Sequence, residues 1–230
     1  MAEGGVAPPF WVTAGEQTLG RGRIGRPWVS RPGNLFSSLA LREAAPPVHL
    51  PELAFVAAIA LTGALDEIAK PGRLDLGIKW PNDVQVGGRK IAGILVEGRQ
   101  GGAETVTVIG IGVNCAHHPE PDNYEATDLG ELLGEPVSPT IMFEALRGHM
   151  AKTLALWDRG RGFAAIRQAW LDRATGIGGP IAVRQAKAEF SGTFEGLDER
   201  GGLILRTADG SRRTVAAGEV FLGPMEPANG

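Results

Sequence analysis

The chain has 230 residues, 43% of them hydrophobic and 21% charged, and a formal net charge of −3. This composition is typical of a folded globular protein, and at about 150 residues per domain the length favours one main domain and a smaller second one. The slightly acidic balance argues against bulk binding to nucleic acid or to an anionic membrane. The single cysteine, Cys115, excludes an internal disulfide and a cysteine-rich metal site, which fits a cytoplasmic protein.

No segment has the pattern of a signal peptide or of a membrane span. The first five residues lack a basic region followed by an apolar core. The most apolar run, from Leu53 to Leu65, is too short to cross a bilayer and is bounded by Glu52 and Asp66. We therefore expect no membrane partner.

The first predicted strand, Phe10 to Ala14, leads into an arginine loop that runs from Gly20 to Trp28 with the sequence GRGRIGRPW. No Asp or Glu occurs between Gln17 and Arg42, so the local field is strongly positive. Guanidinium groups pair with carboxylate and phosphate, and glycines let the backbone approach a ligand closely. The loop is therefore suited to an anion that carries both groups.

Other interpretations of the arginine loop compete with this one. The letters fit G-x-G-x-x-G, but a dinucleotide fingerprint should open directly into a helix, and Pro27 follows instead. A phosphate-binding P-loop would need Gly-Lys-Ser/Thr, which is absent. A nucleic-acid-binding arm and a solvated basic loop both remain open from the local string alone.

A strand from Asn34 to Leu41 is predicted to leave the loop, followed by a helix from Glu52 to Lys70. Pro51 suits the first turn of this helix, and Pro71-Gly72 ends it. Because the helix is apolar almost all round, it should be buried.

A dense β region comes next. Strands are predicted at Leu76 to Trp80 and Thr105 to Val113, and between them a hairpin of Val84–Val86 and Arg89–Glu97 turns on Gly87-Gly88. Hairpin pairing makes the sheet at least partly antiparallel, which is a second argument against a dinucleotide-binding fold.

The second half begins with helices. Ser138-Pro139 predicts the start of a helix that runs to about Asp158, and a second helix carries Phe163, Ile166 and Trp170. The glycine-rich stretch from Gly176 to Pro180 marks a domain boundary. Only short strands follow, which favours a small barrel. They are expected at Ile181–Lys187, Phe190–Leu197, Leu203–Thr207, Arg212–Ala216 and Val220–Phe221.

Two lysines flank the predicted hairpin. On a strand period of two, Lys90 shares a face with Ala92, Ile94 and Val96, where a lysine is uncommon unless an anion meets it. Lys79 and Asp83 lie at the turn end. The competing interpretation is an edge strand protected by a lysine.

Three strings together resemble biotin protein ligase, the biotin–[acetyl-CoA-carboxylase] ligase family. They are the arginine loop running into Ser30 and Gly33-Asn34-Leu35, then Lys79–Asp83, then Arg89–Glu97 followed by Gly110–Asn114. The resemblance continues weakly to Gly218-Glu219-Val220. It implies an α+β fold in which a catalytic domain (residues 1–176) has the mixed sheet and packed helices of class II aminoacyl-tRNA synthetases. An SH3-like β-barrel would occupy residues 177–230.

The resemblance implies that biotin is activated with ATP and Mg²⁺ to biotinyl-5′-AMP and is then transferred to a lysine of a biotin carboxyl carrier protein. Catalysis would rest on Lys90 and Arg23, with Asp83 supporting Mg²⁺ through the phosphates. Trp28 would pack against adenine, Lys79 would support phosphate, and Asn82, Val113 and Asn114 would line the nucleotide site. Contacts to biotin or its adenylate would come from Gln17, Gly20, Arg21, Gly22, Arg23, Lys90 and Gly93.

The chain also departs from the family pattern. A segment ending in Ser-Thr-Asn precedes the strand at Trp11 in the family and supplies part of the biotin pocket, and this sequence begins after it. A truncated homologue that binds biotin without efficient turnover, and a lipoate or octanoate ligase, are therefore alternatives. Because no helix-turn-helix domain is present, we expect no DNA binding; a homodimer is left open. His117-His118 beside Cys115 fits no standard zinc spacing, and we expect a loop there.

Overall fold

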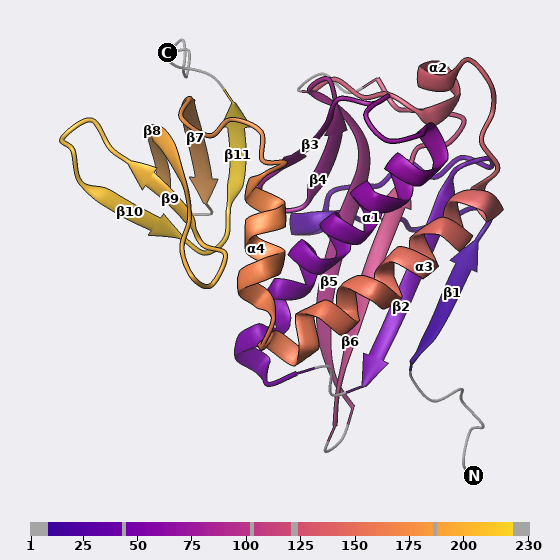
Figure 1. The fold of residues 1–230 in the computed structure, drawn as a ribbon, viewed down its shortest axis with the longest axis horizontal. Coiled ribbons are helices and arrows are strands. Elements are labelled where there is room, and N and C mark those ends of the chain that lie inside the picture. Colours follow the sequence, from indigo (N-terminus) through magenta and orange to yellow (C-terminus); the bar gives the residue numbers. More distant parts are fainter. Residues whose placement is uncertain (1–8, 43–44, 102–103, 121–123, 186–187, 223–230) are drawn as a thin grey trace.

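The computed structural model describes residues 9–42, 45–101, 104–120, 124–185 and 188–222. Its first layer is a six-stranded sheet in the order β1-β2-β6-β5-β4-β3 (Figure 1). The strands are β1 (Phe10–Ala14), β2 (Leu35–Arg42), β3 (Leu76–Lys79), β4 (Asp83–Val86), β5 (Arg89–Gly101) and β6 (Glu104–Val113).

Every pairing between these named strands is antiparallel, so the prediction of a mixed sheet is wrong in this respect. The cause is the connectivity. Short turns join β3 to β4 and β4 to β5, and a hairpin can only pair its two strands antiparallel. The predicted two-glycine turn is present, with Gly87 and Gly88 at φ 55° and 82°, a region that favours glycine.

Helices pack on one face of the sheet and form the second layer, as Figure 1 shows. They are α1 (Leu53–Ala69), α3 (Pro139–Trp157) and α4 (Phe163–Leu171), with the short helices η2 (Pro47–Glu52), η3 (Asp158–Gly160) and α2 (Leu129–Leu133) at their ends and connections. Ser138 caps α3 and Pro139 follows it, as predicted. Helix α2 was missed, although Asp128 caps it and Glu131 stands three residues later, a capping pattern that the sequence contains.

Helix α1 is the centre of the hydrophobic core. Leu53, Val56, Leu61 and Leu65 are fully buried, which confirms the expectation of a buried helix. The segment Pro47–Ala69 is long and apolar enough to cross a membrane, but its side chains already pack against the sheet, α3 and α4. Its hydrophobicity is therefore explained by the interior of this fold.

A second, five-stranded antiparallel sheet follows α4 in the order β10-β9-β8-β7-β11. Its strands are β7 (Pro180–Gln185), β8 (Ala188–Leu197), β9 (Leu203–Arg206), β10 (Arg212–Val215) and β11 (Glu219–Leu222). These match the predicted short strands within a few residues, except that residues 186–187 lie outside the described part. Closure into a barrel stays a prediction.

The two sheets share a hydrophobic cluster. The indole Nε1 of Trp80, at the end of β3, donates a hydrogen bond of 3.0 Å to the carbonyl of Gly201 in the β8–β9 turn. Gly201 has a φ of 82°, and a side chain there would lie 2.7 Å from the ring of Phe55 on α1. The β8–β9 turn is thus fitted against the main core.

Candidate active site

A cavity of about 600 Å³ lies where the arginine loop, the β4–β5 hairpin, β6 and the start of β11 meet. Gly110 and Gly112 of β6 line it, while Ile109 and Val113 on the same strand are buried in the core. Most of the residues predicted from the sequence line this one cavity. They are Gln17, Gly20, Arg21, Gly22, Arg23, Trp28, Lys79, Asn82, Asp83, Lys90 and Gly93.

The arginine loop folds back on itself. Gly22 N–H donates to the carbonyl of Arg26 at 2.7 Å, and Trp28 N–H donates to the carbonyl of Gly20 at 2.9 Å. Between these bonds lies the short 3-10 helix η1 (Arg23–Gly25), and Gly25 adopts a φ of 71°. Gly20 itself is confined, because a Cβ there would lie 2.7 Å from the carbonyl of Trp28. No longer helix opens after Gly25, which agrees with the rejection of a dinucleotide fingerprint.

Each arginine of this loop that lines the cavity is tied to a different part of the chain. Arg21 pairs with Glu97 on β5, and Arg26 pairs with Glu219 on β11. Arg23 donates to the Asn82 side chain and to the carbonyl of Gly218, both at 3.2 Å. Burial lowers the pKa of the Arg23 guanidinium from its ordinary value, although the group stays charged at neutral pH. These contacts of Arg21, Arg23 and Arg26, called the clasp below, hold the loop across the cavity and place its guanidinium groups in the cavity lining.

Lys90 is the second source of positive charge. Its Nζ lies 2.7 Å from the Asp83 carboxylate, 5.4 Å from the centroid of the Trp28 ring and 5.5 Å from that of Tyr124. Aromatic faces attract an ammonium within about 6 Å. The lysine is thus held in the cavity by one carboxylate and two rings.

The prediction that Lys90 shares a strand face with Ala92 and Ile94 is wrong. The register between β4 and β5 shifts, so that Val84 pairs with Ala92 and Gln85 pairs with Lys90, leaving Ile91 without an opposite residue. This β-bulge reverses the alternation, as an extra residue on one strand does. Ala92 and Ile94 are buried in the core, while the Lys90 side chain lies over Gly93 on the cavity side.

Lys79 and Asn82 complete the turn end of the cavity. Burial lowers the pKa of Lys79 from 10.5, with the neighbouring Lys90 adding to the effect and Asp83 opposing it. The Asn82 amide donates to the carbonyl of Ile94 and accepts from Arg23, which fixes its orientation. Because burial removes part of the hydration of the Lys79 ammonium, a nearby anion strongly stabilises its charged form.

Trp28 lies against a floor made of glycine. A Cβ on Gly93 would be 2.9 Å from the indole ring, and one on Gly112 would be 2.7 Å from it. The Nε1 atom of Trp28 is buried and has no hydrogen-bond partner among the described residues. Strands β5 and β6 therefore need glycine at these positions so that the ring can lie flat in the cavity.

Two predicted site residues do not line the cavity. Val113 is fully buried in the core, because it faces the opposite side of β6 from Gly112. Asn114 is buried as well, and its amide donates to the carbonyl of Thr127 at 3.0 Å. In this structure Asn114 holds the following loop in place, and its role at a nucleotide site stays a prediction.

Several cavity residues were missed by the sequence reasoning. Gly218, Glu219, Val220 and Phe221 come from the second sheet, Tyr124 from the loop before α2, and Glu97 from β5. Glu97 and Gly218-Glu219 stand in strings that carried the resemblance, but no charge or period in the sequence indicated that they approach the arginine loop. Tyr124 had no signal beyond being the only tyrosine.

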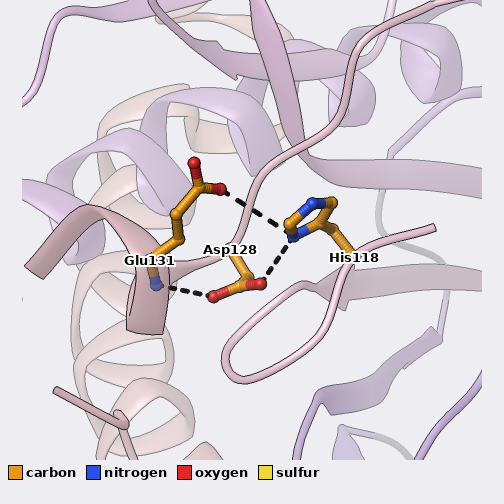
Figure 2. Close-up of side chains that lie close together, drawn as sticks. All are labelled: His118, Asp128 and Glu131. Carbon is orange, nitrogen blue, oxygen red and sulfur yellow. Dashed lines mark hydrogen bonds and ion pairs between the residues drawn. The ribbon is translucent and has the colours of Figure 1, made fainter. Parts of the chain in front are cut away.

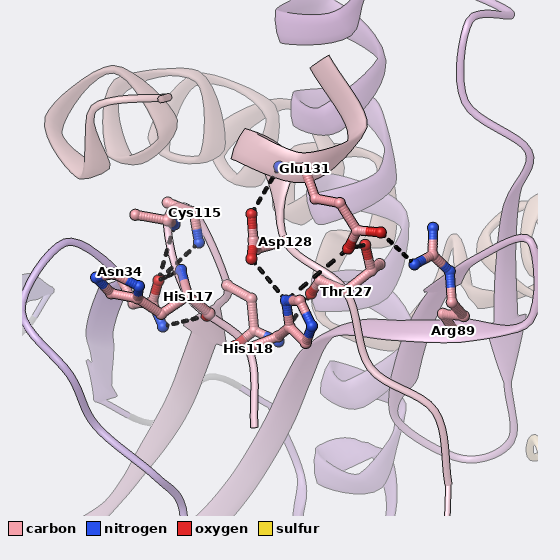
Figure 3. A network of polar contacts seen from close by, with 10 residues as sticks. Asn34, Arg89, Cys115, His117, His118, Thr127, Asp128 and Glu131 are labelled. Carbon is pink, nitrogen blue, oxygen red and sulfur yellow. Dashed lines mark hydrogen bonds and ion pairs between the residues drawn. The ribbon is translucent and has the colours of Figure 1, made fainter. Parts of the chain in front are cut away.

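The loop after β6 is held by a polar network (Figure 3). The Oδ1 atom of Asn34 accepts from the backbone N–H groups of Cys115, Ala116 and His117 at 2.9 to 3.1 Å. At the other end, the Thr127 N–H donates to the carbonyl of Lys90, and the Lys90 N–H donates to the carbonyl of Glu125. The network thus clamps the loop to β5 directly at Lys90.

His118, Asp128 and Glu131 are the group of described side chains that could hold a cation (Figure 2). His118 Nδ1 lies 2.6 Å from the Asp128 carboxylate, which also accepts from the Glu131 N–H as the cap of α2. The Glu131 carboxylate accepts from Arg89 and Thr127, and the Arg89 bond lowers its pKa. These contacts tie the loop that follows β6 to the start of α2 and, through Arg89, to β5.

The comparisons with known proteins agree with this geometry. Residues 4–114 match the Biotin/lipoate A/B protein ligase family, and residues 176–223 match the Biotin protein ligase C terminal domain. The chain is 42% identical to Biotin--[acetyl-CoA-carboxylase] ligase from Paracoccus denitrificans, over 95% of this chain and 92% of the relative. It is 34% identical to the Bifunctional ligase/repressor BirA from Bacillus subtilis, over 92% of this chain and 66% of that protein.

Solved structures give the same result. Biotin protein ligase from Aquifex aeolicus, determined in complex with biotin and ATP, aligns with a TM-score of 0.82 at 26% identity, covering 97% of this chain and 92% of that one. The fold, the site and the sequence similarity over nearly the whole length lead to one conclusion. The chain belongs to the biotin protein ligase family.

Proposed function

We propose that this chain activates biotin with ATP to biotinyl-5′-AMP and transfers the biotinyl group to a lysine of a biotin carboxyl carrier protein. The observation that carries the proposal is the convergence of Arg21, Arg23, Lys79 and Lys90 on one cavity. The relative from Paracoccus denitrificans, named as a ligase for acetyl-CoA carboxylase, supports the choice of acceptor. The alternatives of a non-catalytic module and of a lipoate ligase have no such support.

The first step joins two anions. A carboxylate oxygen of biotin attacks the α-phosphorus of ATP, and pyrophosphate leaves. Lys90 and Arg23 offset the repulsion between the two substrates and stabilise the charge that grows at phosphorus, because fixed cations in a desolvated site cost little reorganisation during the reaction. Trp28, on its glycine floor, offers a flat apolar surface against which adenine packs.

Mg²⁺ would neutralise the charge of the departing pyrophosphate when it is bound. Asp83 is the carboxylate that would support it. One carboxylate is sufficient for a Mg²⁺ ion that takes its remaining ligands from phosphates and water. Because Lys90 contacts Asp83 in this structure, Lys90 and the ion would share the Asp83 carboxylate. Lys79, whose charge is partly desolvated, would meet the phosphates from the same turn.

The second step needs no nucleophile from the ligase. The amine of the carrier lysine attacks the carbonyl carbon of the mixed anhydride, and AMP leaves. The role of the cavity is then to hold the adenylate away from water until the carrier arrives. The clasp formed by Arg21, Arg23 and Arg26 over three segments suits this role.

The finer architecture belongs to the same proposal. We assign residues 1–176 to a catalytic domain of the class II aminoacyl-tRNA synthetase type and residues 177–230 to an SH3-like domain. The glycine-rich boundary and the separate family matches support this division. The second domain takes part in the site, because Gly218 and Glu219 line the cavity and bind the arginine loop.

The test is transfer to a purified apo carrier domain. The chain, incubated with biotin, MgATP and the carrier, should add one biotinyl group to one lysine, as detected by intact-protein mass spectrometry. A carrier whose acceptor lysine is replaced by arginine is the control. Failure to modify the carrier, with biotin binding intact, would favour a non-catalytic binding module, and modification with lipoate but not with biotin would favour the lipoate ligase.

A further inference from the structure

Glu97 is a cavity residue to which the proposed reaction gives no role. It lies on β5, where its backbone pairs with Val108 on β6. Its two carboxylate oxygens lie 3.1 and 3.0 Å from one atom, the Nη2 of Arg21. The pair joins the arginine loop to the rigid sheet at a point far from the loop in sequence.

The geometry of this contact leaves part of Arg21 for a ligand. Since Nη2 alone makes both contacts to Glu97, the Nη1 and Nε donors of the guanidinium are not used by the carboxylate. Within the described part of the chain, no other partner is recorded for them. A guanidinium anchored at one nitrogen keeps its planar fork in a defined orientation, which is what recognition of a carboxylate requires.

A contribution to fold stability does not explain the pair well. The side chain of Arg21 is 53% exposed and that of Glu97 is 37% exposed, and ion pairs at such exposure contribute little to stability. What the pair does fix is the direction of a long, flexible side chain on a glycine-rich loop. Without Glu97, Arg21 could turn towards solvent.

We propose that Glu97 is a positioning residue that orients Arg21 towards the carboxylate of biotin. The inference rests on the proposed function and adds a residue to it. Glu97 does not touch the reacting atoms; it acts on binding through Arg21. Its removal should therefore weaken biotin binding without slowing the chemical step.

The first measurement is calorimetry of biotin binding in the absence of ATP. Glu97→Gln should weaken the affinity by about threefold to fivefold, the range expected for the loss of one exposed ion pair. At saturating biotin, the rate of ATP–pyrophosphate exchange should stay within about twofold of wild type. Glu144→Gln is the matched control, because it removes the partner of another exposed arginine, Arg147, on α3 and away from the cavity.

A charge swap separates positioning from mere pairing. The double variant Arg21→Glu with Glu97→Arg can form an ion pair again, so its thermal stability should match wild type, yet biotin affinity should stay low because an anion now faces the cavity. Recovery of affinity in the swap would overturn the proposal. So would tighter binding by Glu97→Gln, since Glu97 would then be a competitor for Arg21, and so would unchanged binding.

The same experiments distinguish failure of this inference from failure of the proposed function. If wild type binds biotin but shows no exchange, the ligase proposal fails while the calorimetric comparison still decides the role of Glu97. If wild type binds no biotin, both fail.

Discussion

The Nζ atom of Lys90 lies 2.7 Å from the carboxylate of Asp83, and the two residues stand on neighbouring strands joined by a two-glycine turn. A β-bulge at Ile91 turns Lys90 out of the core and towards this partner. The Asp83 carboxylate compensates the charge of the Lys90 ammonium, which is partly removed from water in the cavity. An arriving phosphate or carboxylate can replace Asp83 as the partner of the Lys90 ammonium.

Replacing Lys90 with alanine should lower biotin-dependent ATP–pyrophosphate exchange by about 100-fold or more, as for loss of one fixed donor to a developing charge. The measurement is the exchange rate at saturating substrates. Lys152→Ala, at an exposed position on α3, is the control and should leave the rate unchanged. A Lys90→Ala enzyme of full activity would remove Lys90 from the catalytic machinery.

Gly112→Ala should disrupt the floor beneath Trp28. The added Cβ would lie 2.7 Å from the indole ring, so the ring must move, and biotin-dependent exchange should fall by about tenfold or more. Gly98→Ala on β5 is the control, because Gly98 does not line the cavity and no atom lies within 4 Å of the new Cβ. Equal activity of the two variants would contradict the packing described for Trp28.

Local patterns in the sequence located the strands and the long helices, whereas most of the cavity residues were named from the resemblance to biotin protein ligase. Alternating and continuous apolar runs marked β2, β6 and α1, and the Gly87-Gly88 turn predicted the hairpin. The side of the sheet on which Lys90 lies could not be predicted. Counting alternate residues along one strand assumes regular pairing, whereas a β-bulge arises only from how two strands pair. The ion pair between Arg26 and Glu219 joins residues 193 positions apart, so no local pattern could predict it.

Lys79→Met should stabilise the fold while reducing exchange. Burial lowers the pKa of Lys79 below its ordinary 10.5, so the unfolded chain binds this proton more tightly than the folded one. The free energy of unfolding of wild type therefore increases as the pH rises from the lowered pKa of Lys79 to 10.5, because in this window the unfolded chain holds the proton that the folded chain has lost. The advantage of Lys79→Met should be largest at neutral pH and shrink across that window.

Urea unfolding of wild type and Lys79→Met at several pH values measures this difference. Lys152→Met, at an exposed site, should show no pH-dependent difference from wild type. A Lys79→Met protein that is less stable than wild type at neutral pH would show that the neighbouring Asp83 outweighs the cost of burial.

Cys115 should be unreactive in the folded protein. Burial raises the pKa of its thiol to about 12, so almost no thiolate exists at pH 8, and the side chain is also closed to reagents. Iodoacetamide at pH 8 should leave the native chain unmodified and alkylate it fully in denaturant, as seen by mass spectrometry. Rapid labelling of the native chain would mean that the loop clamped by Asn34 opens readily.

The most direct test of the central claim is biotin-dependent exchange of labelled pyrophosphate into ATP by the wild-type chain and by Arg23→Ala. If the cavity joins the biotin carboxylate to the α-phosphate, wild type will exchange pyrophosphate only when biotin is present, and Arg23→Ala will lose most of this rate. Exchange that does not depend on biotin, or that is absent from wild type under saturating substrates, would contradict it.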